Sequence, residues 1–155
     1  MSLWLLIFQA FGVIIKETPN KTGLSSIKDT KPSILKVSFS KIIDDNNFGL
    51  PMPSDEKVNN AKKIQKIIKT LLTIRSKTGA ELVTTNKSNN IGGCERCDIQ
   101  KWSWQNQKIK NYLKEISKNT IYIIRAGESR IFGSIEHDVF FVHCIEYKPG
   151  DIYKH

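Results

Sequence analysis

The spacing of hydrophobic residues predicts two helices in the middle of the chain. Between Val58 and Leu72, apolar residues recur at steps of three and four, which is the period of one helix face. Ser54 is suited to cap this helix, which is predicted over residues 55–77 with lysines on its opposite face. A second apolar stripe predicts a helix over residues 103–117; its members are Trp104, Ile109, Tyr112, Leu113 and Ile116.

A different pattern, short apolar runs broken by turn residues, predicts strands. Residues 34–40 alternate apolar and polar positions, as a half-buried strand does. After residue 120, the runs predict strands at residues 121–125, 130–136 and 139–146. Tight turns join consecutive strands in antiparallel fashion. We therefore expect one α+β domain, in which a small antiparallel sheet carries both helices on one face.

The first 33 residues stand apart from this domain, which is expected to span residues 34–155. An apolar run over residues 3–15 is shorter than the roughly 20 residues that cross a bilayer, so no membrane span is expected. It also lacks the flanking features of a signal peptide. The run is predicted to be a buried strand or helix that covers the core, with a membrane-surface anchor as the alternative. Residues 16–33 have the turn formers and charges of a linker.

Charge adds a candidate partner. The 155 residues include 24 Lys and Arg against 15 Asp and Glu, a formal net charge of +9. A small protein this basic attracts polyanions, and nucleic acid is the commonest polyanion in a cell. The alternative is that a composition rich in Lys and Asn reflects codon usage and a solvated surface. Three cysteines make a poor disulfide framework, which favours a reducing cytoplasm.

Two of those cysteines form a Cys-x-x-Cys motif, at Cys94 and Cys97. Two thiolates at this spacing can supply half of a tetrahedral zinc site. No second motif of this kind follows, and the pair falls within residues 83–101, which show no periodicity and are predicted to be a polar loop. We therefore expect neither a metal nor another cofactor.

The last third of the chain resembles a known family. Arg125 and Arg130 bracket a turn in an Arg-x-Gly-x-x-Arg pattern, the following run to Phe140 has the form of a hairpin, and Ile152-Tyr153-Lys154 is an aromatic and basic ending. This order is similar to the RelE/ParE superfamily of small toxins. The resemblance covers residues 119–155 well, residues 34–77 weakly and the first 33 residues not at all. Lysines that the family carries on its second strand are missing between Ile131 and Ile135.

The resemblance implies a toxin of a toxin–antitoxin system that binds RNA, cleaves mRNA on the ribosome without a metal and is held by a cognate antitoxin. Its chemistry would need arginines for charge on the phosphoryl group, an aromatic residue for stacking or proton transfer, and a general acid or base. The implied catalytic residues are Arg125, Arg130, Tyr153 and His155, and Lys148 and Lys154 could hold flanking phosphates. Lys62 and Lys66 are RNA-binding candidates for a different reason: they lie on the lysine face of the first helix. Such a face is usually only solvent-exposed, but it could contact ribosomal RNA or the acidic surface of an antitoxin.

Two alternatives stay open. The missing strand lysines favour a non-catalytic module on the same scaffold that binds RNA or a protein partner. The aromatic, basic and imidazole groups at the C-terminus favour an endoribonuclease. On residue type alone, Arg125 and Arg130 are also compatible with surface ion pairs to Glu128 or Glu136.

Overall fold

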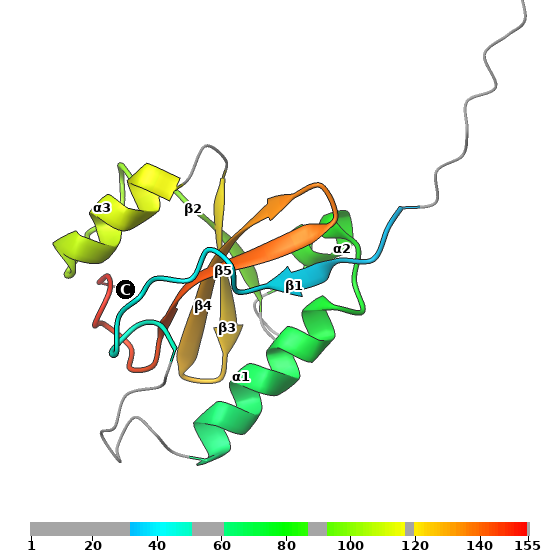
Figure 1. Cartoon of the computed structure of the whole chain (residues 1–155), viewed down its shortest axis with the longest axis horizontal. Coiled ribbons are helices and arrows are strands. Elements are labelled where there is room, and N and C mark those ends of the chain that lie inside the picture. Colours follow the sequence, from blue (N-terminus) through cyan, green and yellow to red (C-terminus); the bar gives the residue numbers. More distant parts are fainter. Residues whose placement is uncertain (1–31, 51–60, 87–92, 117–119, 155) are drawn as a thin grey trace, which may run out of the picture. The chain divides into compact units, whose positions relative to one another are not determined.

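The computed structural model describes residues 32–50, 61–86, 93–116 and 120–154 (Figure 1). The N-terminal apolar segment, the Ser54 cap and His155 lie outside these residues. Within them the chain forms five strands and three helices, which confirms the predicted α+β class. In chain order, these are β1 Lys36–Ser38, α1 Ala61–Ile74, α2 Gly79–Val83, β2 Cys94–Cys97, α3 Gln107–Ile116, β3 Ile121–Ala126, β4 Ser129–Glu136 and β5 Val139–Glu146.

The strands form one sheet in the order β1-β5-β4-β3-β2. The three C-terminal strands are antiparallel neighbours, as predicted. The prediction of a wholly antiparallel sheet is wrong, because β1 pairs with β5 in parallel. No tight turn joins these two strands; the rest of the domain lies between them in sequence, so the turn argument does not fix their relative direction. The sequence pattern also missed β2, a four-residue edge strand whose mixed burial hides the alternation.

The helices cover both faces of the sheet, so the prediction that they share one face is wrong. On one face, Ile67 and Ile74 of α1 pack with Ile124 and Ile131. On the other face, the apolar side of α3 packs with the residues next to these in the strands, such as Ile123. Consecutive residues along a strand, such as Ile123 and Ile124, are both buried although their side chains lie on opposite faces of the sheet. Each face therefore needs a helix to cover it. Figure 1 shows α1 and α3 on either side of the strands.

The helix predicted over residues 55–77 is confirmed by α1 over its described residues, and it ends three residues earlier than predicted. Helix α1 ends at Ile74, and a separate five-residue helix, α2, begins at Gly79. Thr78 caps α2: its hydroxyl accepts a hydrogen bond from the Glu81 amide, and the Glu81 carboxylate accepts one from the Thr78 amide. This reciprocal cap starts a second short helix that the apolar period did not predict.

A β-bulge interrupts the pairing of β4 with β5. From the turn, pairing runs as far as Gly133 opposite Val142, but Phe132 lies opposite Cys144, so His143 is the extra residue. A Cβ atom on Gly133 would come within 2.4 Å of the Phe140 ring and 2.5 Å of the Phe141 carbonyl oxygen. Only glycine fits there. The bulge shifts the register by one residue and places Arg130 opposite Glu146.

His143 is buried and hydrogen-bonded through both ring nitrogens. Nδ1 lies 3.2 Å from the Lys41 carbonyl oxygen, and Nε2 lies 2.9 Å from the Ser134 hydroxyl. A carbonyl only accepts, so Nδ1 carries the proton and Nε2 accepts from Ser134 in the neutral ring. Burial lowers the pKa of His143, while its hydrogen bond to the Lys41 carbonyl opposes the shift. The neutral imidazole therefore ties β4, β5 and the segment after β1 together.

This network predicts that stability falls with acidification near pH 6. In the unfolded chain His143 titrates near pH 6.5, and in the folded protein its pKa is lower. Between these values the unfolded state binds more protons, so the free energy of unfolding decreases as the pH falls from about 7 to 5. Urea denaturation at both pH values should show this decrease, and His143→Gln should reduce its size.

The exposed His137 provides the control. It has a φ of 54° in the β4–β5 turn, a conformation that asparagine tolerates, so His137→Asn should keep the wild-type pH dependence. An unchanged pH dependence in His143→Gln would show that other groups cause the acid sensitivity.

Candidate functional site

Arg125 and Arg130 face one another across the β3–β4 hairpin, at the end where its turn lies. The turn is tight because Gly127 adopts a φ of 71°, which glycine reaches without strain. Both arginines are two residues from side chains of the α3-facing core, Ile123 and Phe132, so they lie on the same face as that core. The hairpin therefore brings the two guanidinium groups to one face.

Each arginine is paired with a carboxylate, but with neither of the acidic side chains expected from sequence. Arg125 donates to Glu95 Oε1 from Nε at 3.2 Å, with Nη2 at 3.1 Å. Arg130 Nη1 lies 3.4 Å from Glu146 Oε2. Glu128 contributes only its backbone carbonyl to Arg130. The result is a charged row across the sheet in the order Glu146, Arg130, Arg125, Glu95, which we call the charged row.

The two arginines differ in exposure, and this separates their possible roles. The Arg130 side chain is 10% exposed and that of Glu146 is fully buried, whereas the Arg125 side chain is 42% exposed. Glu146 Oε1 also accepts hydrogen bonds from the amides of Gly150 and Ile152, at 3.2 and 2.9 Å. The Arg130–Glu146 pair thus holds the C-terminal segment against the sheet. Arg125 is the arginine that solvent, and therefore a ligand, can reach.

Tyr153 lies beside the charged row, with its ring in an aromatic cluster. Its ring centroid is 4.6 Å from that of Trp102 and 5.9 Å from that of Phe132. Burial raises the pKa of Tyr153 to about 12, and the charges of both arginines act in the opposite direction. The phenol is therefore protonated at neutral pH and suited to donate a hydrogen bond. A ring that is only 5% exposed is not placed to stack on a nucleobase.

The expected RNA-binding lysines occupy several positions around this end of the sheet. Lys62 and Lys66 of α1 line a groove of about 340 Å³ with the β3–β4 turn. They lie across the turn from the arginines, on the α1 side. Lys148 is exposed just after β5 ends, and Lys154 is exposed next to Tyr153. His155 lies outside the described residues.

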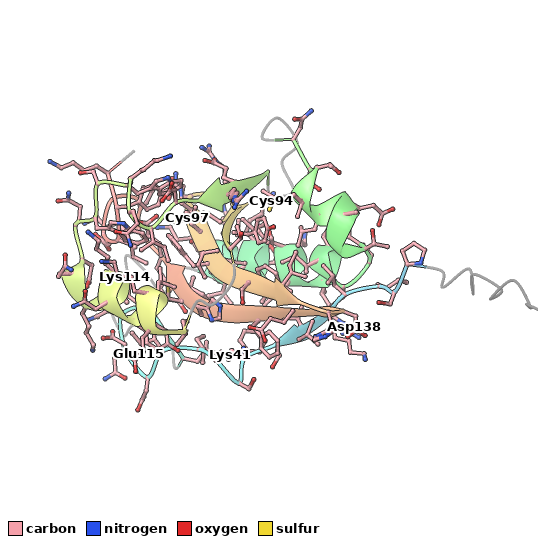
Figure 2. The ribbon with its side chains drawn as sticks, turned by 90° about the horizontal axis from the view of Figure 1, so that it is seen from above. Lys41, Cys94, Cys97, Lys114, Glu115 and Asp138 are labelled. Atoms are coloured by element: carbon pink, nitrogen blue, oxygen red, sulfur yellow. The ribbon has the colours of Figure 1, made fainter. Side chains whose placement is uncertain are left out.

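The Cys-x-x-Cys motif lies in edge strand β2, so the prediction that it falls in a loop is wrong (Figure 2). Three residues apart in a strand, the two side chains leave opposite faces. Cys94 packs with the core on the α1 face and Cys97 with the core on the α3 face. Burial raises the pKa of each thiol to about 12. With their side chains on opposite faces of the sheet, the two cysteines pack as core residues and cannot bind the same metal ion.

Sequence reasoning missed both carboxylates of the charged row. Regular pairing that starts at the turn of residues 136–139 would place Glu146 on the opposite face of the sheet from Arg130. Only the extra residue, His143, brings the two side chains to the same face. Glu95 lies in the strand that showed no alternation. Nothing in the spacing of the sequence signals either pairing.

Comparisons with models of known protein families, with curated proteins and with solved structures found no match for this chain. The resemblance to RelE/ParE toxins therefore rests on the residues that carry it. Among the residues that the structure describes, no helix has the length and apolar character needed to cross a membrane.

The difference between the two arginines predicts different effects on folding. Arg130→Ala leaves the Glu146 carboxylate buried without its cation, which should lower the free energy of unfolding by about 3 kcal/mol. Arg125→Ala breaks a partly exposed pair and should cost about 1 kcal/mol or less. Urea denaturation of both variants measures the two losses.

A double variant tests the cause. Arg130→Met combined with Glu146→Gln removes the buried charge and keeps an oxygen for the two backbone amides, so it should be more stable than Arg130→Ala. Equal losses for Arg125→Ala and Arg130→Ala would contradict this division of roles.

Proposed function

We propose that this domain binds RNA through the end of the sheet at which the β3–β4 turn lies. The observation that carries the proposal is that exposed or partly exposed basic side chains from three separate segments gather there: Lys62 and Lys66 from α1, Arg125 from β3 and Lys148 after β5. We call these four residues the basic end.

Three carboxylates near the basic end are paired with basic side chains of the protein. Glu95 and Glu146 pair with the arginines, and Glu128 pairs with Lys63 at 3.3 Å. Together with the net charge of +9, this supports contact with phosphate groups. Because the Tyr153 ring is buried, the contacts expected at the basic end are with the RNA backbone more than with the faces of bases.

The first test is the salt dependence of RNA binding. Neutralising about four phosphates on single-stranded RNA gives a slope near −3 in a plot of log affinity against log salt concentration. Reversing two charges, in Lys62→Glu with Lys66→Glu, should weaken binding and flatten this slope. Fluorescence anisotropy with a labelled single-stranded RNA measures both effects.

Helix α3 offers a matched control. Lys110 and Lys114 have the same spacing as Lys62 and Lys66 but lie on the helix that covers the other face. Lys110→Glu with Lys114→Glu changes the net charge by the same amount and should leave most of the affinity. Equal losses in the two double variants, or an affinity that does not change with salt, would contradict a specific basic end.

Cleavage of the bound RNA is the second candidate function, favoured by the proximity of Arg125, Arg130 and Tyr153. In this proposal Arg125 stabilises charge on the phosphoryl group, Arg130 fixes the C-terminal segment, and Tyr153 donates a hydrogen bond. His155 is the candidate general acid or base. The resemblance to RelE/ParE toxins supports mRNA on the ribosome as the substrate, no metal, and a cognate antitoxin as the partner.

Mapping RNA 5′ ends after induction in cells tests cleavage. Arg125→Ala should reduce the cleavage rate by on the order of 100-fold, because the contact strengthens as charge develops in the transition state. Arg125→Lys should restore part of the rate, since one ammonium cannot reproduce the bidentate geometry. Expression and thermal unfolding of each variant are measured alongside.

Arg96, an exposed arginine in the neighbouring strand β2, is the control. It pairs in register with Tyr122, so its side chain lies on the opposite face of the sheet from Arg125. Arg96→Ala should cut like the wild type. If the wild-type protein binds RNA with the predicted salt dependence but produces no new 5′ ends on translating ribosomes, the domain is a binding module and the catalytic proposal is wrong.

A further inference from the structure

An apolar groove of about 560 Å³ lies between β1 and α1, away from the basic end. Six large hydrophobic side chains are exposed in the described part of the chain, and four of them line this groove. Ile34 and Phe39, which flank β1, are 58% and 39% exposed; Ile68 and Leu72 of α1 are 49% and 55% exposed. Contiguous exposed apolar side chains of this kind mark interaction surfaces more often than single ones do.

One wall of the groove is a strand at the edge of the sheet. β1 is the first strand in the sheet order. On its outer side the Leu35 amide, just before the strand, donates to the Lys77 carbonyl at 2.8 Å, and the open stretch of the edge lies beyond it, at Val37. The Lys36 amide donates to the Asp138 carbonyl at 2.7 Å and so points toward β5. In a parallel strand, the backbone N–H and C=O groups of successive residues point alternately to the two neighbouring strand positions. Since those of Lys36 point toward β5, those of Val37 point outward. An extended segment can hydrogen-bond there while its side chains enter the groove.

The charges around the groove select the chemistry of the occupant. No acidic residue lines it, whereas Arg75 does, as does Lys36, which also pairs with Asp138 at 3.0 Å. Helix α1, which forms the other wall, carries four lysines and no acidic residue. A second copy of this chain would bring an equally basic helix to the same place, which like-charge repulsion opposes. A groove with a single partly exposed aromatic side chain, Phe39, offers RNA bases little stacking surface, so an acidic protein segment fits best.

We propose that the groove between β1 and α1 binds an extended segment of an acidic partner protein, in which apolar residues alternate with carboxylates and the backbone pairs with β1. This site is separate from the basic end. Lys62 and Lys66 are in the first half of α1, whereas Ile68, Leu72 and Arg75 are in or just after its second half. The proposal therefore does not depend on RNA binding.

The test uses the full chain and two synthetic peptides of about ten residues, the length of a typical strand with its flanks. In one peptide valine and isoleucine alternate with glutamate; in the other, lysine replaces glutamate. Fluorescence anisotropy should show saturable binding of the glutamate peptide, with at least tenfold weaker binding of the lysine peptide. Methylation of backbone nitrogens at one alternate set of positions should abolish binding, and methylation at the other set should not.

Substitutions in the protein locate the site. Ile68→Glu and Leu72→Glu change exposed side chains and should each weaken binding of the glutamate peptide at least tenfold, because a carboxylate would enter the apolar groove. Val83→Glu, at a comparably exposed apolar position outside the groove, should bind like the wild type. Arg75→Glu should weaken binding, whereas Lys114→Glu on α3, far from β1 and Asp138 in Figure 2, should not.

Several results would overturn the proposal. One is the absence of saturable binding of the glutamate peptide to the wild-type chain. Another is equal binding to the wild type and to the Ile68→Glu and Leu72→Glu variants. Equal binding of the two methylated peptides would exclude strand pairing. A wild-type dimer in sedimentation equilibrium that Leu72→Glu dissociates would make the groove a contact between copies of this chain.

Discussion

The buried ion pair between Arg130 and Glu146 is the interaction on which this end of the molecule depends. A carboxylate with no exposed surface is costly unless it is neutralised and hydrogen-bonded, and Glu146 meets both conditions. One of its oxygens lies against Arg130, and the other accepts the amides of Gly150 and Ile152. Through these bonds the pair fixes the path of the chain to Tyr153 and the position of Arg130 in the charged row.

The pair exists only because the sheet contains a bulge. With regular pairing from the β4–β5 turn, Arg130 would lie opposite Ile145 and Glu146 would point into the other core. Gly133 permits the bulge, since any side chain there would collide with Phe140 and the Phe141 backbone. His143, the extra residue, then finds partners in Ser134 and Lys41 instead of leaving its ring unsatisfied in the core. A glycine and a buried histidine thus determine which charges meet.

This explains which parts of the structure could be predicted from sequence. The hairpin strands follow from apolar runs and turn residues, and α3 follows from the spacing of Ile109 and Leu113, because these signals are local. The parallel pairing of β1 and the opposed helices depend on contacts between distant segments. In the candidate site, the two arginines were identifiable from the motif around Gly127. Their carboxylate partners were not, since one depends on the bulge and the other on an edge strand without a periodic pattern.

The unequal burial of Arg125 and Arg130 gives the two arginines of the motif different roles. A guanidinium that neutralises a buried carboxylate cannot move to a ligand without leaving that carboxylate buried and unpaired, which costs several kcal/mol. A guanidinium in a partly exposed pair exchanges one anionic partner for another at little cost, because water already solvates it in part. If a phosphate binds in this charged row, Arg125 therefore makes the contact and Glu95 is the group displaced, while Arg130 and Glu146 remain the fixed frame against which that exchange occurs.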